Sequence, residues 1–134
     1  METKYESNIK VVKNSAEAIY SRLADFTRLG VAIPQDKIKN WTATPDSCHF
    51  TVDQIGDMGL RIADRQLNSL VKYTADGETR FNFNLWVQMK EAAPYDSRIK
   101  VTLKADINVM IKTMFGSKLQ QFVDSLAESI ALNM

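Results

Sequence analysis

Hydrophobic residues near the end of the chain recur with the period of a helix. Over residues 108–133 most apolar positions are separated by steps of three or four, which places them on one side of a helix with 3.6 residues per turn. These positions are Ile111, Phe115, Leu119, Phe122, Val123, Leu126 and Ile130, and the polar residues opposite them are Ser117, Gln121, Asp124 and Glu128. Such a helix extends roughly 36 Å at ~1.5 Å per residue, so it requires a broad apolar surface to pack against.

Upstream, the period changes to the two-residue alternation of β strands. The pattern predicts a first strand over residues 5–12 and six more over residues 37–44, 48–54, 59–66, 70–75, 80–91 and 98–107. One face of the longest strand carries Phe81, Phe83, Leu85, Val87 and Met89. A sheet with one apolar face must be covered on that face, and the C-terminal helix is the expected cover.

The first strand is followed by a helical pattern. Alternation in this strand predicts a buried face made of Tyr5, Ser7, Ile9 and Val11. Ser15 is a typical helix N-cap and predicts a short helix over residues 16–25. A second helical segment runs from Phe26 to a stop at Pro34, with an interruption at Gly30.

Short segments with turn chemistry separate the later strands. They are Pro45-Asp46-Ser47, Gly56-Asp57-Met58-Gly59, Leu67-Asn68-Ser69, Asp76-Gly77 and Ala93-Pro94-Tyr95-Asp96. Connections this short join antiparallel neighbours, and a large antiparallel sheet curls so that its apolar face becomes concave. The sequence therefore predicts an α+β fold in a single domain, residues 1–134. A curved seven-stranded antiparallel sheet, with two short helices after strand 1, is wrapped around the long C-terminal helix.

Composition argues against several classes of function. The chain has 17 basic and 16 acidic residues mixed along its length, so it gives no electrostatic reason to bind nucleic acid. Cys48 is the single cysteine, which is typical of a protein in a reducing compartment. No stretch approaches ~18 apolar residues, and no signal-sequence pattern opens the chain. We therefore expect a soluble, cytoplasmic protein without membrane insertion.

Several local patterns, in this order of elements, resemble the START-like (SRPBCC) superfamily, the pollen-allergen-type helix-grip proteins, and in particular its small bacterial polyketide cyclase-like members. The residues that carry the resemblance are Ser15-Ala16-Glu17-Ala18-Ile19-Tyr20, Leu23-Ala24-Asp25-Phe26, Trp41-Thr42-Ala43, Cys48-His49-Phe50, Leu60-Arg61-Ile62 and Ala105-Asp106-Ile107-Asn108. The resemblance covers nearly the whole chain. It implies an apolar cavity between sheet and C-terminal helix that binds hydrophobic molecules such as lipids, sterols or polyketides, but it does not specify an activity.

Apolar residues of the strands and of the final helix would line such a cavity. The candidates are Phe50, Leu60, Ile62, Phe81, Phe83, Leu85, Met110, Met114, Phe115 and Phe122. Met110 and Met114 stand one helical turn apart, and Met58 lies in a predicted turn near the mouth. Flexible thioethers adapt to ligands of varied shape, although ordinary core packing explains the same spacing. Gly116, in the middle of the helix, permits either a bend or the close approach of a strand.

Few polar residues are placed to act in the cavity. Asp64 alternates with Leu60 and Ile62, so strand parity aims it inward, where its pKa would rise and it would orient a ligand or transfer a proton. In the alternative, the strand curls or ends there and Asp64 is solvated or paired with an arginine. Tyr5 and Ser7 are further candidates for a polar anchor.

Metal and thiol chemistry are not expected. His49 is the only histidine, and alternation turns it outward, away from the face of Cys48. A metal site would need further ligands that the chain does not offer. We therefore expect no metal and no cofactor, and we interpret Cys48 as a small buried residue.

Three functions are compatible with the sequence. The leading hypothesis is binding of a small hydrophobic ligand without catalysis. The second is a polyketide cyclase or aromatase-like enzyme that moves protons with Asp64 or Tyr73. The third is a protein-interaction domain similar to the chaperone-activator branch, or a homodimer, using the outer sheet face around Trp86. The third function requires Trp86 to be exposed to solvent. In the alternative, long side chains such as Arg61 or Lys100 cover it.

Overall fold

The chain forms a β sheet, two short helices and one long helix in the computed structural model, which describes residues 2–30, 33, 38–77 and 81–134. The elements in chain order are β1 (Glu2–Glu6), β2 (Lys10–Val12), α1 (Ala16–Leu23), α2 (Phe26–Leu29), β3 (Ile38–Ala43), β4 (Ser47–Val52), β5 (Gly56–Gln66), β6 (Leu70–Ala75), β7 (Asn82–Ala93), β8 (Asp96–Asp106) and α3 (Val109–Asn133). The predicted stop of the second helix at Pro34 and the predicted strand starts at Lys37 and Arg80 lie outside the described residues.

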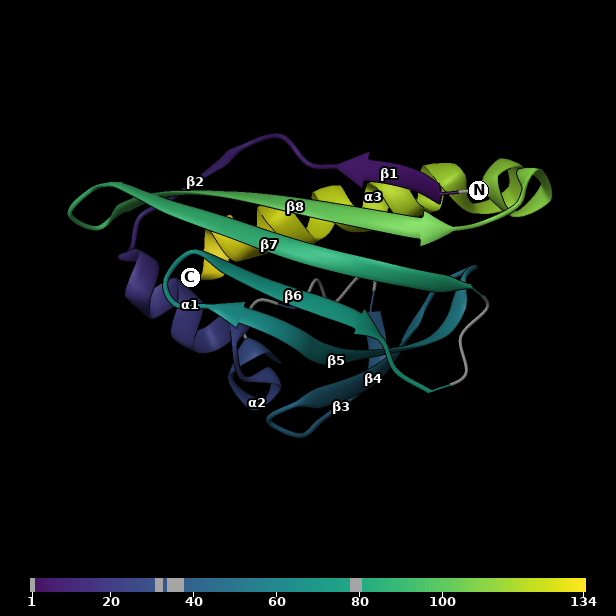
Figure 1. Cartoon of the computed structure of the whole chain (residues 1–134), viewed down its shortest axis with the longest axis horizontal. Coiled ribbons are helices and arrows are strands. Elements are labelled where there is room, and N and C mark those ends of the chain that lie inside the picture. Colours follow the sequence, from purple (N-terminus) through teal and green to yellow (C-terminus); the bar gives the residue numbers. More distant parts are fainter. Residues whose placement is uncertain (1, 31–32, 34–37, 78–80) are drawn as a thin grey trace.

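The strands form one twisted antiparallel sheet with the spatial order β1-β8-β7-β6-β5-β4-β3, and β2 takes the edge position beside β8 that β1 has left. α3 crosses one face of the sheet close to β8, β2 and β1, and α1 covers β6 and β7 (Figure 1). The predicted α+β fold is confirmed. Eight strands are counted rather than seven because the first predicted strand is divided in two.

The division of the first strand occurs at residues 7–9. The backbone N–H of Ser7 donates to the carbonyl of Val101 at 2.9 Å, and its Oγ accepts from the N–H of Val101 at 3.0 Å. The side chain thus continues the ladder where the backbone turns away. Parity changes across the break, so Val12 is buried while Ile9 and Val11 are exposed, which reverses the predicted burial of these last two residues.

The segment Gly56-Asp57-Met58-Gly59 forms the start of β5 rather than the predicted turn. The turn lies at residues 53–55, before β5 begins. The imidazole of His49 on the neighbouring strand packs over Gly59, where a Cβ would overlap the carbonyl oxygen of Asp76. Gly59 therefore serves this close approach. Met58 is buried beside it instead of lying in a turn, so that prediction is wrong.

A β-bulge in β5 reverses the orientation of the residues after it. Ile62 is in register with Tyr73, but Asp64 is in register with the adjacent β6 residue Lys72, so one β5 residue between them is unpaired. Because an extra residue shifts the two-residue alternation by one, Asp64 falls on the outer face and is exposed. Of the two alternatives for Asp64, the inward carboxylate is therefore wrong, and the solvated side chain is observed.

α3 begins with a defined cap and extends past the end of β8 (Figure 1). The Oδ1 of Asn108 accepts a hydrogen bond from the N–H of Ile111 at 2.9 Å. Met110 and Met114 are 65% and 60% exposed. They lie on the outward side of the helix, on the part that passes the end of the sheet, so their prediction as cavity residues is wrong.

Gly116 in α3 allows a strand to approach the helix closely. A Cβ on Gly116 would lie 3.3 Å from the hydroxyl oxygen of Tyr5 on β1. That hydroxyl is buried and has no hydrogen-bond partner among the described residues. From Phe115 onward the inward side of α3 is buried, including Leu119 and Ile130.

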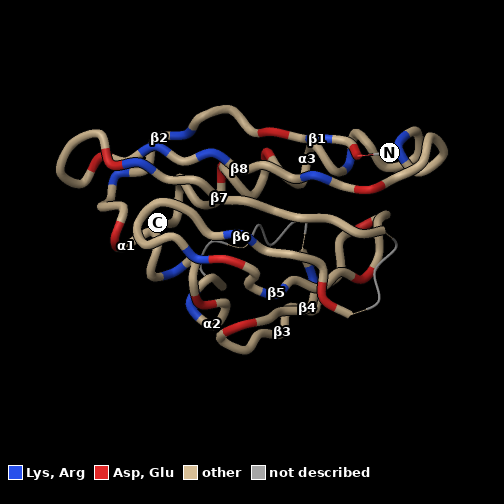
Figure 2. The backbone as a smooth tube through the Cα atoms, viewed as in Figure 1, with Lys and Arg blue, Asp and Glu red and all other residues tan. Residues whose placement is uncertain are grey.

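Charged positions are interspersed along the strands rather than gathered into blocks (Figure 2). Glu6, for example, forms ion pairs with both Lys4 and Lys100, and these pairs lower its pKa to about 2. Among the described helices, none is both long enough and apolar enough to span a membrane.

Truncation of the buried side of α3 should destabilise the fold far more than truncation of its exposed side. Leu119→Ala is expected to lower the free energy of unfolding by about 2–5 kcal/mol, because Leu119 is fully buried between helix and sheet. Urea denaturation followed by circular dichroism measures this change. Leu132→Ala, on the same helix but 76% exposed, is the control and should change stability by less than ~0.5 kcal/mol. Similar losses in both variants would contradict the packing described.

Candidate functional site

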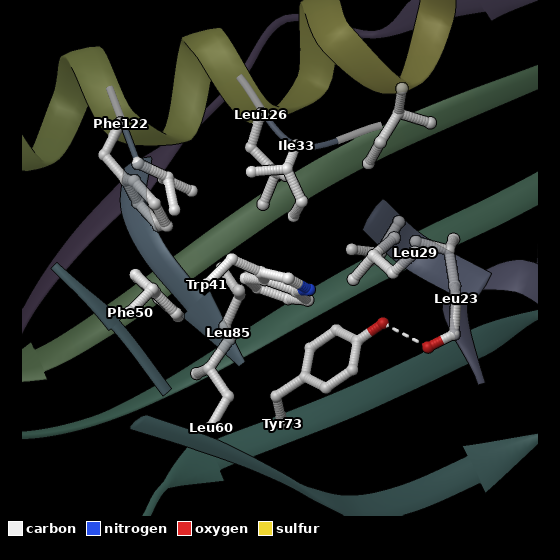
Figure 3. A pocket seen from close by; sticks show the side chains of 13 residues that line it. Leu23, Leu29, Ile33, Trp41, Phe50, Leu60, Tyr73, Leu85, Phe122 and Leu126 are labelled. Carbon is white, nitrogen blue, oxygen red and sulfur yellow. Dashed lines mark hydrogen bonds between the residues drawn. The ribbon is translucent and has the colours of Figure 1, made fainter. Parts of the chain in front are cut away.

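An apolar pocket lies where the C-terminal half of α3 faces α1, α2 and the inner face of the sheet (Figure 3). Its lining residues are Leu23, Leu29, Ile33, Ile38, Trp41, Phe50, Leu60, Tyr73, Leu85, Val87, Phe122, Leu126 and Ile130. The centre of a water molecule can reach about 20 Å³ of this space, and the total unfilled volume between the lining atoms, including the open side, is about 360 Å³. One water needs ~10–15 Å³ of the first measure, so the pocket is nearly filled by its own side chains.

Four aromatic rings line the pocket, and a fifth, that of Phe26, packs against two of them. Trp41 stacks on Phe50 with ring centroids 5.8 Å apart, and Phe50 stacks on Phe122 at 6.3 Å. Phe26 meets Trp41 edge-on at 6.4 Å and lies 5.2 Å from Tyr73. These five rings come from α2, β3, β4, β6 and α3. A change in the rotamer of one ring therefore changes the free volume between several elements.

The only hydroxyl group among the described lining side chains is already hydrogen-bonded. The hydroxyl of Tyr73 donates to the carbonyl oxygen of Leu23 at 2.5 Å (Figure 3). Burial raises the pKa of Tyr73 well above its usual value, because the phenolate would lose its hydration. Tyr73 therefore stays protonated at physiological pH and is held by the end of α1.

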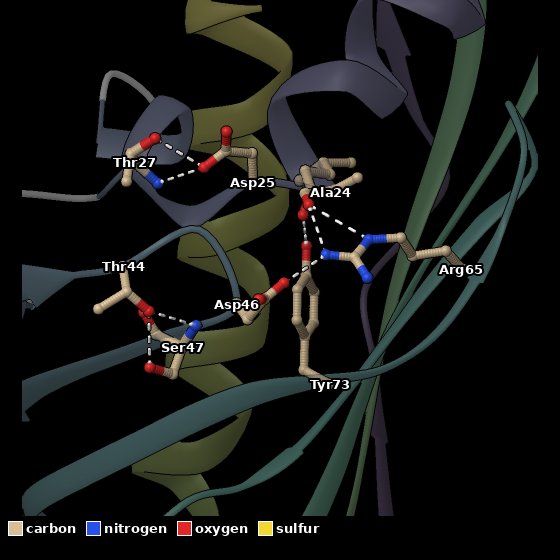
Figure 4. A network of polar contacts seen from close by, with 9 residues as sticks. Ala24, Asp25, Thr27, Thr44, Asp46, Ser47, Arg65 and Tyr73 are labelled. Carbon is tan, nitrogen blue, oxygen red and sulfur yellow. Dashed lines mark hydrogen bonds and ion pairs between the residues drawn. The ribbon is translucent and has the colours of Figure 1, made fainter.

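Polar contacts fasten the junction of α1 and α2 to the sheet (Figure 4). The guanidinium of Arg65 on β5 donates to the carbonyl of Ala24 from Nε at 3.3 Å and from Nη2 at 3.1 Å. Its Nη2 also donates to the carboxylate of Asp46 at 2.9 Å. The N–H of Phe26 donates to the carbonyl of Pro45 at 3.2 Å. The two short helices are thereby held at one side of the pocket.

The structure brings together four of the predicted cavity residues. Phe50, Leu60, Leu85 and Phe122 line the pocket, and ligand contact remains a prediction for them. Ile62 is half-buried against the core, outside the pocket lining.

The remaining aromatic candidates lie under the other half of α3. Phe81, Phe83 and Phe115 are buried in the core but do not line the pocket. Phe83 is in register with Ala105, three residues before the cap of α3 at Asn108. They pack where α3 begins, whereas the pocket lies where it ends.

Three lining residues that were not among the predicted cavity residues follow a visible pattern. Leu126 and Ile130 continue the helical series from Phe122 in steps of four. Val87 shares the strand face of Leu85 in the same way. A choice based on period alone would have included all three residues.

Other lining residues carry no local signal for their position. Trp41 has no readable parity because β3 shifts register between Lys39 and Thr42. Leu23 and Leu29 belong to short helices whose place over the sheet is set by tertiary contacts. Sequence period alone therefore could not assign these residues to the pocket.

Cys48 and His49 are titratable residues that lie outside the pocket, and their environments indicate structural roles. Burial raises the pKa of the Cys48 thiol to about 12, so this side chain is an unreactive part of the core. His49 lies on the outer face, with Nε2 3.1 Å from a carboxylate oxygen of Asp76. Among the described residues, no group of three or more His, Cys, Asp or Glu side chains is placed to hold a metal ion.

Trp86 is covered on the outer face of the sheet by two lysines. The Nζ atoms of Lys72 and Lys104 lie 5.3 Å and 5.6 Å from its ring centroid, within the range of cation–π contacts. The cover therefore comes from these residues rather than from Arg61 or Lys100. The indole is half-buried and does not form an open aromatic anchor for a partner.

Comparison with known proteins identifies the fold. No family model and no curated protein matches the sequence. The structure is similar to that of a START superfamily protein from Mycobacterium smegmatis, with a TM-score of 0.67, 17% identity and coverage of 99% of both chains. The chain has the START-like helix-grip fold.

Two other solved structures are more similar in shape and more distant in sequence. A protein from Thermus thermophilus matches with a TM-score of 0.73 at 10% identity, over 98% of this chain and 96% of that chain. Norcoclaurine synthase from Thalictrum flavum matches with a TM-score of 0.73 at 9% identity, over 98% of this chain and 86% of that chain. At these identities the likeness concerns the fold, and at that level the predicted resemblance is confirmed.

Removal of the Tyr73 hydroxyl should weaken the fold in a pH-dependent way. Tyr73→Phe is expected to lower the free energy of unfolding by about 1–2 kcal/mol at neutral pH, because the carbonyl of Leu23 loses its partner. Because the folded-state pKa of Tyr73 is raised, its contribution is complete below the unfolded-state pKa of 10.0 and declines as the pH rises above it. The stability difference between the parent protein and Tyr73→Phe should therefore shrink above about pH 10, measured by urea denaturation at several pH values.

Tyr95→Phe is the matched control, since Tyr95 is exposed in the β7–β8 turn. It should leave stability unchanged at neutral pH. A constant difference between the parent protein and Tyr73→Phe from neutral to strongly alkaline pH would contradict a buried, hydrogen-bonded phenol.

Proposed function

We propose that this helix-grip domain binds a small hydrophobic molecule in the pocket between α3, the two short helices and the sheet, without catalysing a reaction. The observation that carries the proposal is the lining. The 13 described lining side chains are hydrocarbon except for the hydroxyl of Tyr73 and the indole N–H of Trp41. Small-molecule sites are typically apolar, with a few polar groups that fix orientation.

Apolar contact would provide most of the affinity. Each square ångström of apolar surface withdrawn from water contributes about 25 cal/mol, so a ligand that buries roughly 200 Å² gains about 5 kcal/mol before the costs of association. A ligand of this kind needs no charged partner inside the pocket.

Small-molecule sites usually have a volume of about 300–1,000 Å³. The centre of a water molecule reaches only about 20 Å³ of this pocket, so the aromatic rings must move to admit a ligand. None of the side chains of Trp41, Phe50 and Phe122 makes a hydrogen bond to another described residue. Their rearrangement therefore costs packing contacts but no hydrogen bond. A ligand that enters replaces contacts between rings with contacts between rings and ligand.

The character of the lining favours binding over catalysis. Proton transfer needs a positioned titratable group, and Tyr73 is the only titratable side chain among the described lining residues. Its proton is held by burial and by the bond to Leu23. Asp64, the other candidate of the cyclase-like alternative, lies outside the pocket. The fold itself is neutral on this question, since norcoclaurine synthase also has it.

A larger side chain in the pocket should block binding. Leu126→Phe places an additional ring in the space that a ligand would take, so it is expected to weaken binding of the neutral apolar dye Nile red at least tenfold. Fluorescence titration of the dye measures the affinity. Native mass spectrometry of protein purified from its own cells shows in addition whether a ligand is retained.

Leu132→Phe is the matched control, because the same change is made on an exposed position of the same helix. It should leave dye binding unchanged. Equal affinity in the two variants would place dye binding elsewhere, and failure of the parent protein to bind any apolar molecule would end the proposal.

A further inference from the structure

A groove with two arginines lies beside the apolar pocket. Among the described residues it is lined by Arg22, Thr27, Arg28, Gly30 and Asn133, and the centre of a water molecule can reach about 490 Å³ of this open space. The groove opens to solvent, and the charged side chains among its described lining residues are both cations. It therefore differs in chemistry from the pocket, whose described lining side chains carry no charge at neutral pH.

The groove and the pocket share three helices. α1 and α2 each supply an arginine to the groove and the residue after it, Leu23 or Leu29, to the pocket. α3 supplies Asn133 to the groove and Ile130, one turn earlier, to the pocket. The ends of the same three helices therefore line both spaces.

The two spaces approach each other at Gly30. This residue lines the groove, and a Cβ on it would lie 4.0 Å from the indole Nε1 of Trp41, whose ring lines the pocket. Figure 3 shows the indole nitrogen at the end of the ring that points toward Leu29. The indole N–H has no hydrogen-bond partner among the described residues. A donor is thus available on the side of the pocket that faces Gly30.

The two guanidinium groups are available to an anion. Arg22 has one bond to a described residue, from Nη1 to the carbonyl of Asn133 at 3.5 Å, and Arg28 forms no ion pair with any described side chain. The neighbouring carboxylate, Asp25, accepts from the N–H of Thr27 at 2.9 Å and from its hydroxyl at 2.6 Å. These hydrogen bonds, together with the charge of Arg28, lower the pKa of Asp25. Asp25 is thus engaged with the start of α2 and leaves both arginines without a bound carboxylate.

We infer that the ligand is an amphipathic anion. Its hydrocarbon part occupies the pocket, and its carboxylate or phosphate head lies in the groove between Arg22 and Arg28, with the indole N–H of Trp41 as a further donor. Guanidinium groups match oxyanions in geometry and keep their charge at all physiological pH values. This inference rests on the proposed function, because it requires the pocket to admit a hydrocarbon group.

The test compares three ligands with the same ten-carbon chain: decanoate, decyl phosphate and decanol. Trp41 and Trp86 are the only tryptophans, so the change Trp86→Phe leaves Trp41 as the reporter of binding at the pocket. In this parent protein, decanoate or decyl phosphate should bind at least tenfold more tightly than decanol, and the tighter of the two identifies the head group. Salt should weaken binding of the anion and leave that of decanol unchanged.

The decisive variant combines Arg22→Gln with Arg28→Gln. It should remove the preference for the anion while keeping the affinity for decanol within twofold of the parent value. Arg61→Gln is the matched control, because Arg61 is exposed on β5 away from the groove, and it should keep the preference. Thermal unfolding of each variant shows that the folded state persists at the titration temperature.

Each other outcome overturns part of the interpretation. Equal affinity of the parent protein for decanol and for the anions would reject the amphipathic anion and leave hydrophobic binding intact. Retention of the preference by the double variant would show that the arginines do not hold the head group. An equal loss of decanol and anion affinity would show that they act only on the fold. If none of the three ligands binds and Nile red does not bind either, the proposed function fails as well.

Discussion

The carbonyl groups at the end of α1 accept hydrogen bonds from side chains of the sheet. The position of the pocket depends on these hydrogen bonds. The last carbonyls of a helix have no partner within the helix and must find one elsewhere. Here the hydroxyl of Tyr73 caps Leu23, and the guanidinium of Arg65 caps Ala24. Because the donors come from β6 and β5, the short helices cannot leave the sheet without exposing these bonds or losing them.

This arrangement gives the pocket a fixed frame and an adjustable interior. The frame is polar and directional: the capping bonds fix α1 and α2, and the strand ladders fix β3 to β8. The interior consists of rings that contact one another through dispersion and stacking, which depend weakly on orientation. Trp41, Phe50 and Phe122 can therefore change rotamer while the frame stays in place. The small free volume of the pocket is a property of these rings rather than of the backbone.

The regular parts of the fold could be predicted because their signal is periodic. The heptad-like spacing from Phe115 to Ile130 and the alternation from Phe83 to Met89 both identify the buried face correctly. Both runs are long, and each further residue at the same spacing supports the same assignment of the buried face. The helix cap predicted at Ser15 is observed. Asn108 caps α3 in the same way, although it was not predicted to do so.

The irregular parts could not be predicted, because each depends on a contact with another strand. The unpaired residue before Asp64 is visible only in the register with β6, and the role of Gly59 only in the position of His49. For the candidate site, period identified inward residues but not where free volume remains among them. The pocket is formed where α1 and α2 meet the sheet, and no spacing in the sequence encodes that meeting. Met110 and Met114 show the converse, since a helical pattern continues past the point where the sheet ends.

The interruption at residues 7–9 also affects contacts between molecules. A long, flat strand at the edge of a sheet presents its unpaired backbone groups to other chains and promotes aggregation. In this protein the edge beside β8 is divided into β1, with five residues, and β2, with three. Between them the side chain of Ser7 takes a place in the ladder. Only short, interrupted stretches of unpaired backbone are therefore available to a strand of another molecule, which protects this edge from intermolecular sheet formation.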